Sequence, residues 1–359
     1  MRRRHFEALR PICPACLLAQ TTEAPLELSQ VVREADDVVL EGFLRCGACG
    51  SVFPILDGIP ILVADIRRMV QGHIQAIGAR RDFSGPMADF LGSCCGPGSS
   101  FETTRYHLSI YARDHYGDFD PEDEEEPAPL SAVRLLDIGL QALSQVPEGP
   151  AIDVGCSVGR TSFELAERLD RPVLGVDLSF PMLQLAQDVL IKAELRYPRR
   201  TEGTLYDERI FETPLPRREQ VDFWLCDATN LPLPSATFAA GSHLNVLDCV
   251  PSPIDALRSF ERILRPGARA LLATPYDWSP GATPIEGWIG GHSQRSPAAG
   301  HSEPMLRSLL GGQHPAALQG LKLLAEPLLA EPAKSSWNLR LDARHAASYS
   351  SHLVTLARR

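Results

Sequence analysis

Short apolar runs alternate with segments of helical spacing through the second half of the chain. Apolar runs at residues 151–154, 173–176, 221–225, 238–246 and 268–273 predict five buried strands. Between several of these runs, apolar residues recur every three or four positions, which predicts helices over residues 161–169, 181–195 and 254–264. An alternation of strands and helices is typical of a doubly wound α/β sheet, so we expect that fold class.

Regions outside this pattern predict further elements. The polar residues 197–218 predict an excursion from the sheet, and the acidic run at 120–126 predicts a solvated linker. Apolar spacing predicts a helix over residues 101–117, a helix over 131–143, two strands around the Asp-Gly turn within 52–62, and a closing antiparallel hairpin within 337–359.

Composition narrows the class of protein. With 359 residues, the chain exceeds the usual single domain, so we expect one large domain with a small appended one. A net charge of −10 disfavours a nucleic-acid backbone as the main partner. The chain contains no run of 18 apolar residues, so we expect no membrane-spanning helix. The basic start at residues 1–16 has no apolar stretch of a secretory signal after it, so we expect a cytoplasmic protein.

Nine cysteines in a reducing compartment suggest metal binding rather than disulfides. Cys13 and Cys16 form one CxxC turn, and after 29 intervening residues Cys46 and Cys49 form another, with a glycine after it. Each turn aims two thiolates at one point, so the pair predicts a structural Zn²⁺ site with four cysteine ligands. The alternative is four unligated cysteines. The adjacent residues at 94 and 95, also cysteines, have no partner ligands near them in the sequence.

A loop of small residues follows the first predicted strand of the α/β pattern. Asp153, Gly155, Ser157 and Gly159 alternate there, and small residues permit a tight turn close to a ligand. The spacing is neither GxGxxG nor that of a phosphate loop. Asp177 ends the second strand 24 positions after Asp153, where a carboxylate can accept hydrogen bonds from a ribose diol. An unrelated doubly wound protein with a glycine turn is the alternative.

The segments AIDVGCSVG, VLGVDLS and LRPGARALLATPY resemble motifs of class I S-adenosylmethionine (SAM)-dependent methyltransferases. The resemblance implies a Rossmann-like, seven-stranded methyltransferase domain with SAM as cofactor. It also implies that the acid after the third strand contacts the adenine amino group; alternatively, that acid only caps the following turn. The cofactor-binding residues expected from the resemblance are Asp153, Gly155, Cys156, Ser157, Gly159, Asp177, Leu178, Asp227, Ala228, Asn245 and Tyr111.

Candidate catalytic residues follow the fourth and fifth strands. Asn245 and Asp248 lie where the methyl group is expected in such folds. Tyr276 and His292 belong to a segment rich in aromatic residues and glycine, which we expect to enclose a small substrate. Alternatively, these aromatic residues pack the sheet. Tyr111 lies in the helix at 101–117, which either covers SAM or packs on the core.

Two closer resemblances concern the N-terminal part and the middle of the chain. The second CxxC turn and FPILDGIPIL resemble small zinc-ribbon proteins that activate methyltransferases in translation. Between residues 101 and 291, FETTRYHLSIYARDHYG, LNVLDCVPSP and TPYDWSPGATPIEGWIGG resemble the methyltransferase module of ovothiol (mercaptohistidine) biosynthesis. Together they imply a zinc-ribbon domain at 1–65, a linker with a cofactor-covering helix at 66–130 and a methyltransferase domain at 131–359.

The expected function is N-methylation of a small histidine-like or amine substrate by displacement at the SAM methyl group. Asp248, His292 or His115 is positioned in the sequence to take a proton from the product. Two alternatives stay open: methylation of tRNA, rRNA or a translation protein, and SAM binding in a regulatory protein without turnover. The sequence leaves the methyl acceptor and the oligomeric state undetermined.

Overall fold

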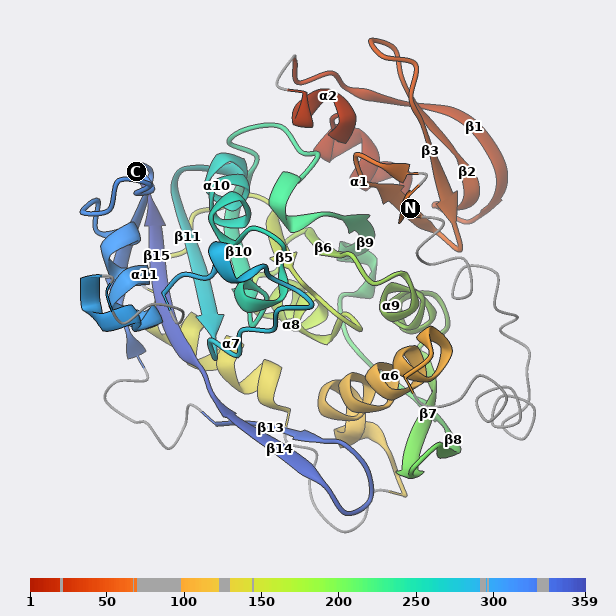
Figure 1. Ribbon diagram of the computed structural model, residues 1–359. Helices are drawn as coiled ribbons and strands as arrows, with labels where there is room; N and C mark the ends of the chain where they lie inside the picture. Colours follow the sequence, from red (N-terminus) through yellow and green to blue (C-terminus); the bar gives the residue numbers. More distant parts are fainter. Residues whose placement is uncertain are drawn as a thin grey trace.

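A single mixed sheet runs through the molecule, and helices cover both of its faces (Figure 1). The structure is a computed structural model. It describes residues 1–19, 22–66, 68–69, 98–122, 130–143, 145–290, 295, 297–327 and 336–359.

Seven strands form the central and C-terminal part of this sheet, in the order β9-β6-β5-β10-β11-β15-β12. Five of them run parallel, while β15 lies antiparallel between β11 and β12. This arrangement confirms the predicted α/β, Rossmann-like sheet. The strands are β5 (Ala151–Val154), β6 (Val173–Asp177), β9 (Val221–Cys226), β10 (Phe238–Leu244), β11 (Leu264–Thr274), β12 (Leu321–Ala325) and β15 (His352–Arg358).

The N-terminal strands continue the same sheet, which has eleven strands in all. β4 pairs in parallel with β9, with Ile61 opposite Leu225 and Leu62 opposite Cys226. The small appended part expected from the sequence therefore forms the edge of the central sheet, while the boundaries expected at residues 65 and 130 stay predictions. Its elements are α1 (Arg3–Leu9), α2 (Pro14–Leu18), β1 (Leu26–Ala35), β2 (Val38–Cys46), β3 (Val52–Leu56) and β4 (Ile59–Leu62).

The two faces of the sheet pack against different helices. Along β9, Phe223 and Leu225 belong to one core cluster, whereas Trp224 belongs to the other. Because side chains alternate across a strand and both faces are buried, the strands appear in the sequence as continuous apolar runs. The first face carries α6 (Ser100–Tyr116), α7 (Ser131–Ala142), α8 (Arg160–Leu169) and α9 (Phe180–Lys192); the second carries α10 (Pro253–Ile263) and α11 (Ser302–Leu310).

Two hairpins lie outside the main sheet. The expected polar excursion forms the hairpin of β7 (Glu194–Glu202) and β8 (Leu205–Glu212), which packs against α6. The expectation of one closing hairpin at the C-terminus is wrong in detail, because β13 (Ser336–Arg340) pairs with β14 (Ala346–Ser350) and β15 enters the sheet instead. β15 is apolar and buried on both faces, whereas β13 and β14 alternate between more and less buried residues.

Short 3₁₀ helices complete the described elements, and one strand boundary differs from the expectation. The turn expected at residues 265–267 lies inside β11, which begins at Leu264 and changes register against β10 before Arg269. The 3₁₀ helices are η1 (Gly117–Phe119), η2 (Arg218–Gln220), η3 (Ala228–Asn230), η4 (Leu247–Cys249), η5 (Ile285–Gly287) and η6 (Pro297–Gly300).

The described helices are too short or too polar to cross a lipid bilayer, and none of them qualifies as a candidate span.

Candidate functional site

The loop between β5 and α8 folds back onto the end of β6. Gly155 has φ +74°, and a Cβ there would lie 2.0 Å from Cγ2 of Val246, so only glycine fits. Ser157 adopts a left-handed conformation as well, and its backbone N–H donates to Oδ2 of Asp177 at 2.9 Å. The loop and Asp177 therefore form one rigid corner of the sheet.

Asp153 ties the corner to its neighbours through three hydroxyl donors. Its Oδ1 accepts from Oγ of Ser242 at 2.6 Å, and its Oδ2 accepts from the hydroxyls of Thr161 and Ser162 at 2.6 and 2.8 Å. Burial raises the pKa of Asp153, and the hydroxyl donors oppose that shift. The side chain thus joins β5, α8 and β10 at the base of the loop.

A cavity of about 530 Å³ opens at the carboxyl ends of β5, β6, β9 and β10. In a doubly wound sheet this is the edge where ligands bind. Cys156 and Gly159, also expected to bind cofactor, do not line it; Cys156 is buried in the core, and Gly159 packs closely against Phe223. The other expected cofactor residues all line it: Asp153, Gly155, Ser157, Asp177, Leu178, Asp227, Ala228, Asn245 and Tyr111.

Two acids lie at one end of the cavity, after β6 and β9. Oδ1 of Asp177 accepts from the N–H of Ser179 at 2.8 Å, so each carboxylate oxygen is held by one backbone donor. Burial raises the pKa of Asp177, and these donors limit the shift. Asp227 uses Oδ1 for both the N–H and the hydroxyl of Thr229, at 2.8 and 2.7 Å. It therefore caps η3, the alternative considered from the sequence, while Oδ2 has no bond to another described residue.

Asn245 and Asp248 lie on the wall that follows β10. Asn245 has φ +54°, and its Oδ1 accepts from Oγ of Ser351 at 3.1 Å. Oδ2 of the buried Asp248 accepts from the N–H of Asp277 at 2.7 Å. Burial raises the pKa of Asp248, so this carboxylate is a better proton acceptor than an exposed one. Asp277 also lines the cavity.

Aromatic side chains from α6 and from the β13–β14 hairpin form the far wall. Trp337 lies opposite Tyr349 in the hairpin register, and both line the cavity with Tyr111 of α6. The hydroxyl of Tyr116, at the end of α6, donates to the carbonyl of Val158 at 2.7 Å and fixes the helix to the loop. Helix α6 therefore both packs on the core and lines the cavity, while the expectation that it covers SAM stays a prediction.

His115 also faces the cavity from α6. Burial lowers the pKa of its imidazole to about 3, with Arg160 acting in the same direction, so His115 is neutral near pH 7. Its Nδ1 has no hydrogen-bond partner among the described residues.

The aromatic side chains after β11, those of Tyr276, Trp278 and Trp288, do not line the cavity, although Pro275 and Asp277 of the same segment do. Trp278 and Trp288 stack on each other, with ring centroids 6.0 Å apart and an interplanar angle of 16°. The hydroxyl of Tyr276 bonds to Nδ1 of His352 at 2.7 Å and not to the cavity. These rings pack on one another, and Tyr276 and Trp278 also pack against the core on the second face of the sheet, in line with the alternative that the aromatic residues pack the sheet. His292 and the cysteines at 94 and 95 lie outside the described residues.

Sequence reasoning missed three residues that line the cavity. Trp337 and Tyr349 of the far wall lie in no motif, and Asp277, beside Asp248, was passed over within TPYDWSPGATPIEGWIGG. The alternation of apolar and polar residues in β13 marks Trp337 as inward-facing, but the pattern does not say which surface it meets.

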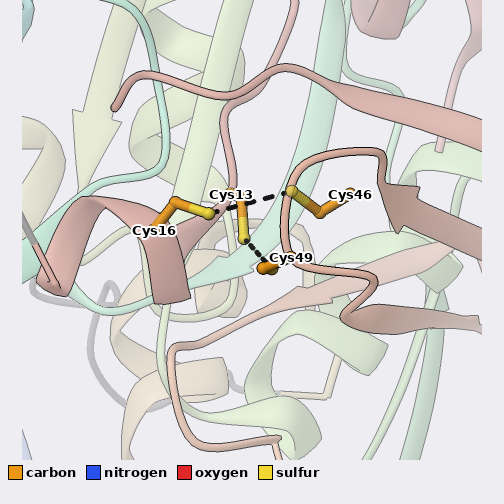
Figure 2. Close-up of side chains that lie close together, drawn as sticks. All are labelled: Cys13, Cys16, Cys46 and Cys49. Carbon is orange, nitrogen blue, oxygen red and sulfur yellow. Dashed lines mark hydrogen bonds between the residues drawn. The ribbon is translucent and has the colours of Figure 1, made fainter. Parts of the chain in front are cut away.

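The four N-terminal cysteines converge at one point, although they come from different elements (Figure 2). Cys13 and Cys16 belong to the first turn of α2, while Cys46 ends β2 and Cys49 lies in the turn after it. The Sγ atoms of Cys13 and Cys49 are 3.6 Å apart, and those of Cys16 and Cys46 are 3.9 Å apart. Zn–S bonds of about 2.3 Å in a tetrahedron require S···S distances of about 3.8 Å, so the four thiols fit a tetrahedral metal ion.

Comparison with known proteins finds a match for the segment that forms part of the cavity wall. Residues 152–272 match the family described as Methyltransferase domain. This segment begins in β5 and ends in β11, so it contains Asp177, Asp227 and Asp248. It leaves out α6, the β13–β14 hairpin and the four cysteines.

Three curated relatives are similar to the chain. O-methyltransferase rstn1 of Aspergillus nomiae is 27% identical over 160 residues, which cover 44% of this chain and 61% of the relative. The 27-O-demethylrifamycin SV methyltransferase of Amycolatopsis mediterranei is 27% identical over 158 residues, covering 44% and 49%. The phosphoethanolamine N-methyltransferase of Triticum aestivum is 27% identical over 135 residues, covering 38% and 22%. The chain thus spans between 22% and 61% of the length of these relatives.

The contact between Gly155 and Val246 predicts a specific pattern of stability loss. Gly155→Ala should lower the free energy of unfolding by about 3 kcal/mol, because it adds a collision to the cost of a left-handed alanine. Gly267→Ala is the matched control: Gly267 has φ +85° with nothing within 4 Å of a Cβ, so we expect a loss of only about 1 kcal/mol. Urea unfolding of both variants measures the difference.

A second substitution isolates the collision. Val246→Ala in the Gly155→Ala background should recover part of the loss, because it removes the methyl group in the way. Equal losses for Gly155→Ala and Gly267→Ala, with no recovery, would contradict the packing of the loop described above.

Proposed function

We propose that this chain, in which residues 152–272 form a class I SAM-dependent methyltransferase domain, methylates a nitrogen of a small histidine-like or amine acceptor. One observation carries the choice of acceptor: the carboxylates of Asp248 and Asp277 share a cavity with the rings of Tyr111, Trp337 and Tyr349. Carboxylates together with aromatic faces suit a planar or cationic nitrogen group better than a neutral hydroxyl.

The cofactor fits the end of the cavity nearest the loop. Asp177 is placed to accept hydrogen bonds from the ribose hydroxyls, and Oδ2 of Asp227 from the adenine amino group. The loop from Gly155 to Ser157 would hold the methionine end, covered by Tyr111. SAM supplies an electrophilic methyl group there, whose C–S bond breaks with its electron pair going to sulfur as the N–C bond to the acceptor forms.

The residues of the chain orient the acceptor and remove a proton. Asn245 and Asp248 follow β10, and the acceptor nitrogen would lie between them and the aromatic wall. Asp248, whose pKa is raised by burial, takes the proton that the product loses, from the other ring nitrogen of an imidazole or from the methylated nitrogen of an amine. His115 stays neutral near pH 7, so it contributes no charge that repels a cationic product.

Two further facts bear on the class of acceptor. The similar proteins include O-methyltransferases and a phosphoethanolamine N-methyltransferase, so these relatives alone do not choose between oxygen and nitrogen. The resemblance of residues 101–291 to the ovothiol module favours a histidine-like acceptor. The cavity volume of about 530 Å³ is in the range of small-molecule sites.

The cofactor assignment predicts that Asp177→Asn weakens SAM binding about ten- to a hundredfold, since hydrogen bonds to a charged group contribute about 1.5–3 kcal/mol. Isothermal titration of SAM into wild type and variant measures it. Asp207→Asn is the control, because Asp207 pairs with Arg199 in the β7–β8 hairpin, outside the cavity. If the wild type does not bind SAM, the proposal is refuted. If Asp177→Asn binds SAM as tightly as the wild type, SAM does not bind at Asp177.

The acceptor assignment predicts methyl transfer to imidazoles or amines. Purified protein with SAM is offered histidine derivatives, primary amines, phenols and a transcribed tRNA, and the products are weighed by mass spectrometry. We expect methylation of a nitrogen compound, and Asp248→Asn should slow it about tenfold or more because the proton acceptor is lost. Methylation of phenols alone or of RNA alone would contradict the proposed acceptor.

We further propose that Cys13, Cys16, Cys46 and Cys49 hold one structural Zn²⁺. Four thiolates fill a tetrahedral shell and leave no open position for substrate. Metal analysis should give one zinc per chain, and the Cys46→Ser/Cys49→Ser double variant should give none and unfold at lower urea concentration. Cys249→Ser, outside the cluster, should keep its zinc. Carefully purified wild type without zinc would contradict the site.

A further inference from the structure

The turn that contains Asp277 has a strained backbone conformation at the preceding residue, Tyr276. Tyr276 has φ +58°, a left-handed conformation that costs a non-glycine residue about 1 kcal/mol or more. Its neighbours Pro275 and Asp277 line the cavity, whereas its ring turns away from it. Such a conformation persists when surrounding contacts hold it in place.

A chain of four side chains supplies these contacts. The hydroxyl of Tyr276 lies 2.7 Å from Nδ1 of His352, whose Nε2 lies 2.8 Å from Oε1 of Glu326. Glu326 in turn accepts from Nε of Arg307 at 2.7 Å, and Arg307 also pairs with Glu303. Because the Arg307 guanidinium pairs with both glutamates, it holds the place of a cation between them, and we interpret the cluster as an ion-pair network.

The chemistry of the donors fixes the direction of the chain. An ionised Glu326 only accepts hydrogen bonds, so Nε2 of His352 carries the proton and donates it. If the imidazole carries only this proton, Nδ1 is an acceptor and the Tyr276 hydroxyl donates to it. His352 itself is fixed at the start of β15, opposite Thr274 at the end of β11.

From Tyr276 the chain continues through the backbone to Asp248. The N–H of Tyr276 donates to Oγ1 of Thr274 at 3.1 Å, and the next N–H, of Asp277, donates to Oδ2 of Asp248 at 2.7 Å. Holding the Tyr276 ring therefore fixes the peptide that bonds to Asp248.

We propose that Tyr276 and His352, supported by Glu326 and Arg307, are positioning residues that keep the N–H of Asp277 on the carboxylate of Asp248, and so keep this proton acceptor ionised. The inference rests on the proposed function for the role of Asp248, but the hydrogen-bond geometry stands without it. The sequence placed Tyr276 at the substrate; the structure assigns it to the support of Asp248 instead.

The proposal has a measurable electrostatic consequence. A hydrogen bond donated to an ionised carboxylate lowers its pKa, and the Asp277 N–H opposes the rise that burial causes at Asp248. The other titratable groups near Asp248 are the side chains of Asp277, Cys249, Tyr276 and Tyr349. Glu303, Glu326 and Arg307 face Tyr276 from the other side. None of them changes in the variants below apart from Tyr276 itself.

The test is a carboxyl ¹³C NMR titration of the full chain, with the Asp248 signal identified by its loss in Asp248→Asn. Tyr276→Phe and His352→Phe should each raise the pKa of Asp248 by about half to one unit. The double variant should show the same shift as the larger single one, because the two residues act in series. Tyr206→Phe is the control: it removes a tyrosine hydroxyl that bonds to Glu102, away from the cavity.

Kinetics then separates this inference from the proposed function. Where wild type transfers methyl groups, the acid limb of its kcat profile should move to higher pH in Tyr276→Phe, with SAM affinity unchanged. An unchanged Asp248 pKa in both variants overturns the inference, whether or not turnover is seen. A shifted pKa in a protein without methyl transfer supports the positioning role and refutes the proposed function alone.

Discussion

The parallel pairing of β4 with β9 is the contact on which both halves of the molecule depend. β9 lies between β4 and β6, and the residue that follows it is Asp227, one of the two acids at one end of the cavity. The turn after Asp227 bonds back to the N-terminal segment: the side-chain amide of Asn230 donates to the carbonyl of Pro14 at 3.0 Å. The cysteine cluster and the cavity are thus connected through one continuous sheet. The position of Asp227 depends both on the central strands and on the N-terminal segment.

Burial and backbone hydrogen-bond donors shift the pKa of the cavity acids in opposite directions. Burial raises the pKa of both Asp177 and Asp248, which favours their neutral forms. Backbone N–H groups aimed at each carboxylate oppose this shift, from the glycine-rich loop at Asp177 and from the turn after β11 at Asp248. The two loops therefore both lower the pKa of a cavity acid through a backbone N–H. Each has a residue in the left-handed conformation, Ser157 or Tyr276, that directs this donor.

Much of the fold follows from the sequence because burial on both faces leaves a clear pattern. The five strands β5, β6, β9, β10 and β11 appear as apolar runs, and the paired CxxC turns bring together four thiols. What the sequence did not predict depends on docking. Period-two alternation shows that Trp337 and Tyr349 face inward, but not that the hairpin covers the cavity. Tyr276 was expected at the substrate because it follows the fifth strand; its left-handed backbone turns the ring toward His352 instead.

The central claim is that SAM occupies the cavity between Asp177 and Asp248, and a crystal structure with S-adenosylhomocysteine tests it most directly. The account predicts ribose hydroxyls on Asp177, the adenine amino group on Asp227, and the sulfur directed at Asn245 and Asp248, under the rings of Tyr111 and Tyr349. A complex in which the ligand lies elsewhere, or in which Asp177 touches no ribose hydroxyl, would contradict it.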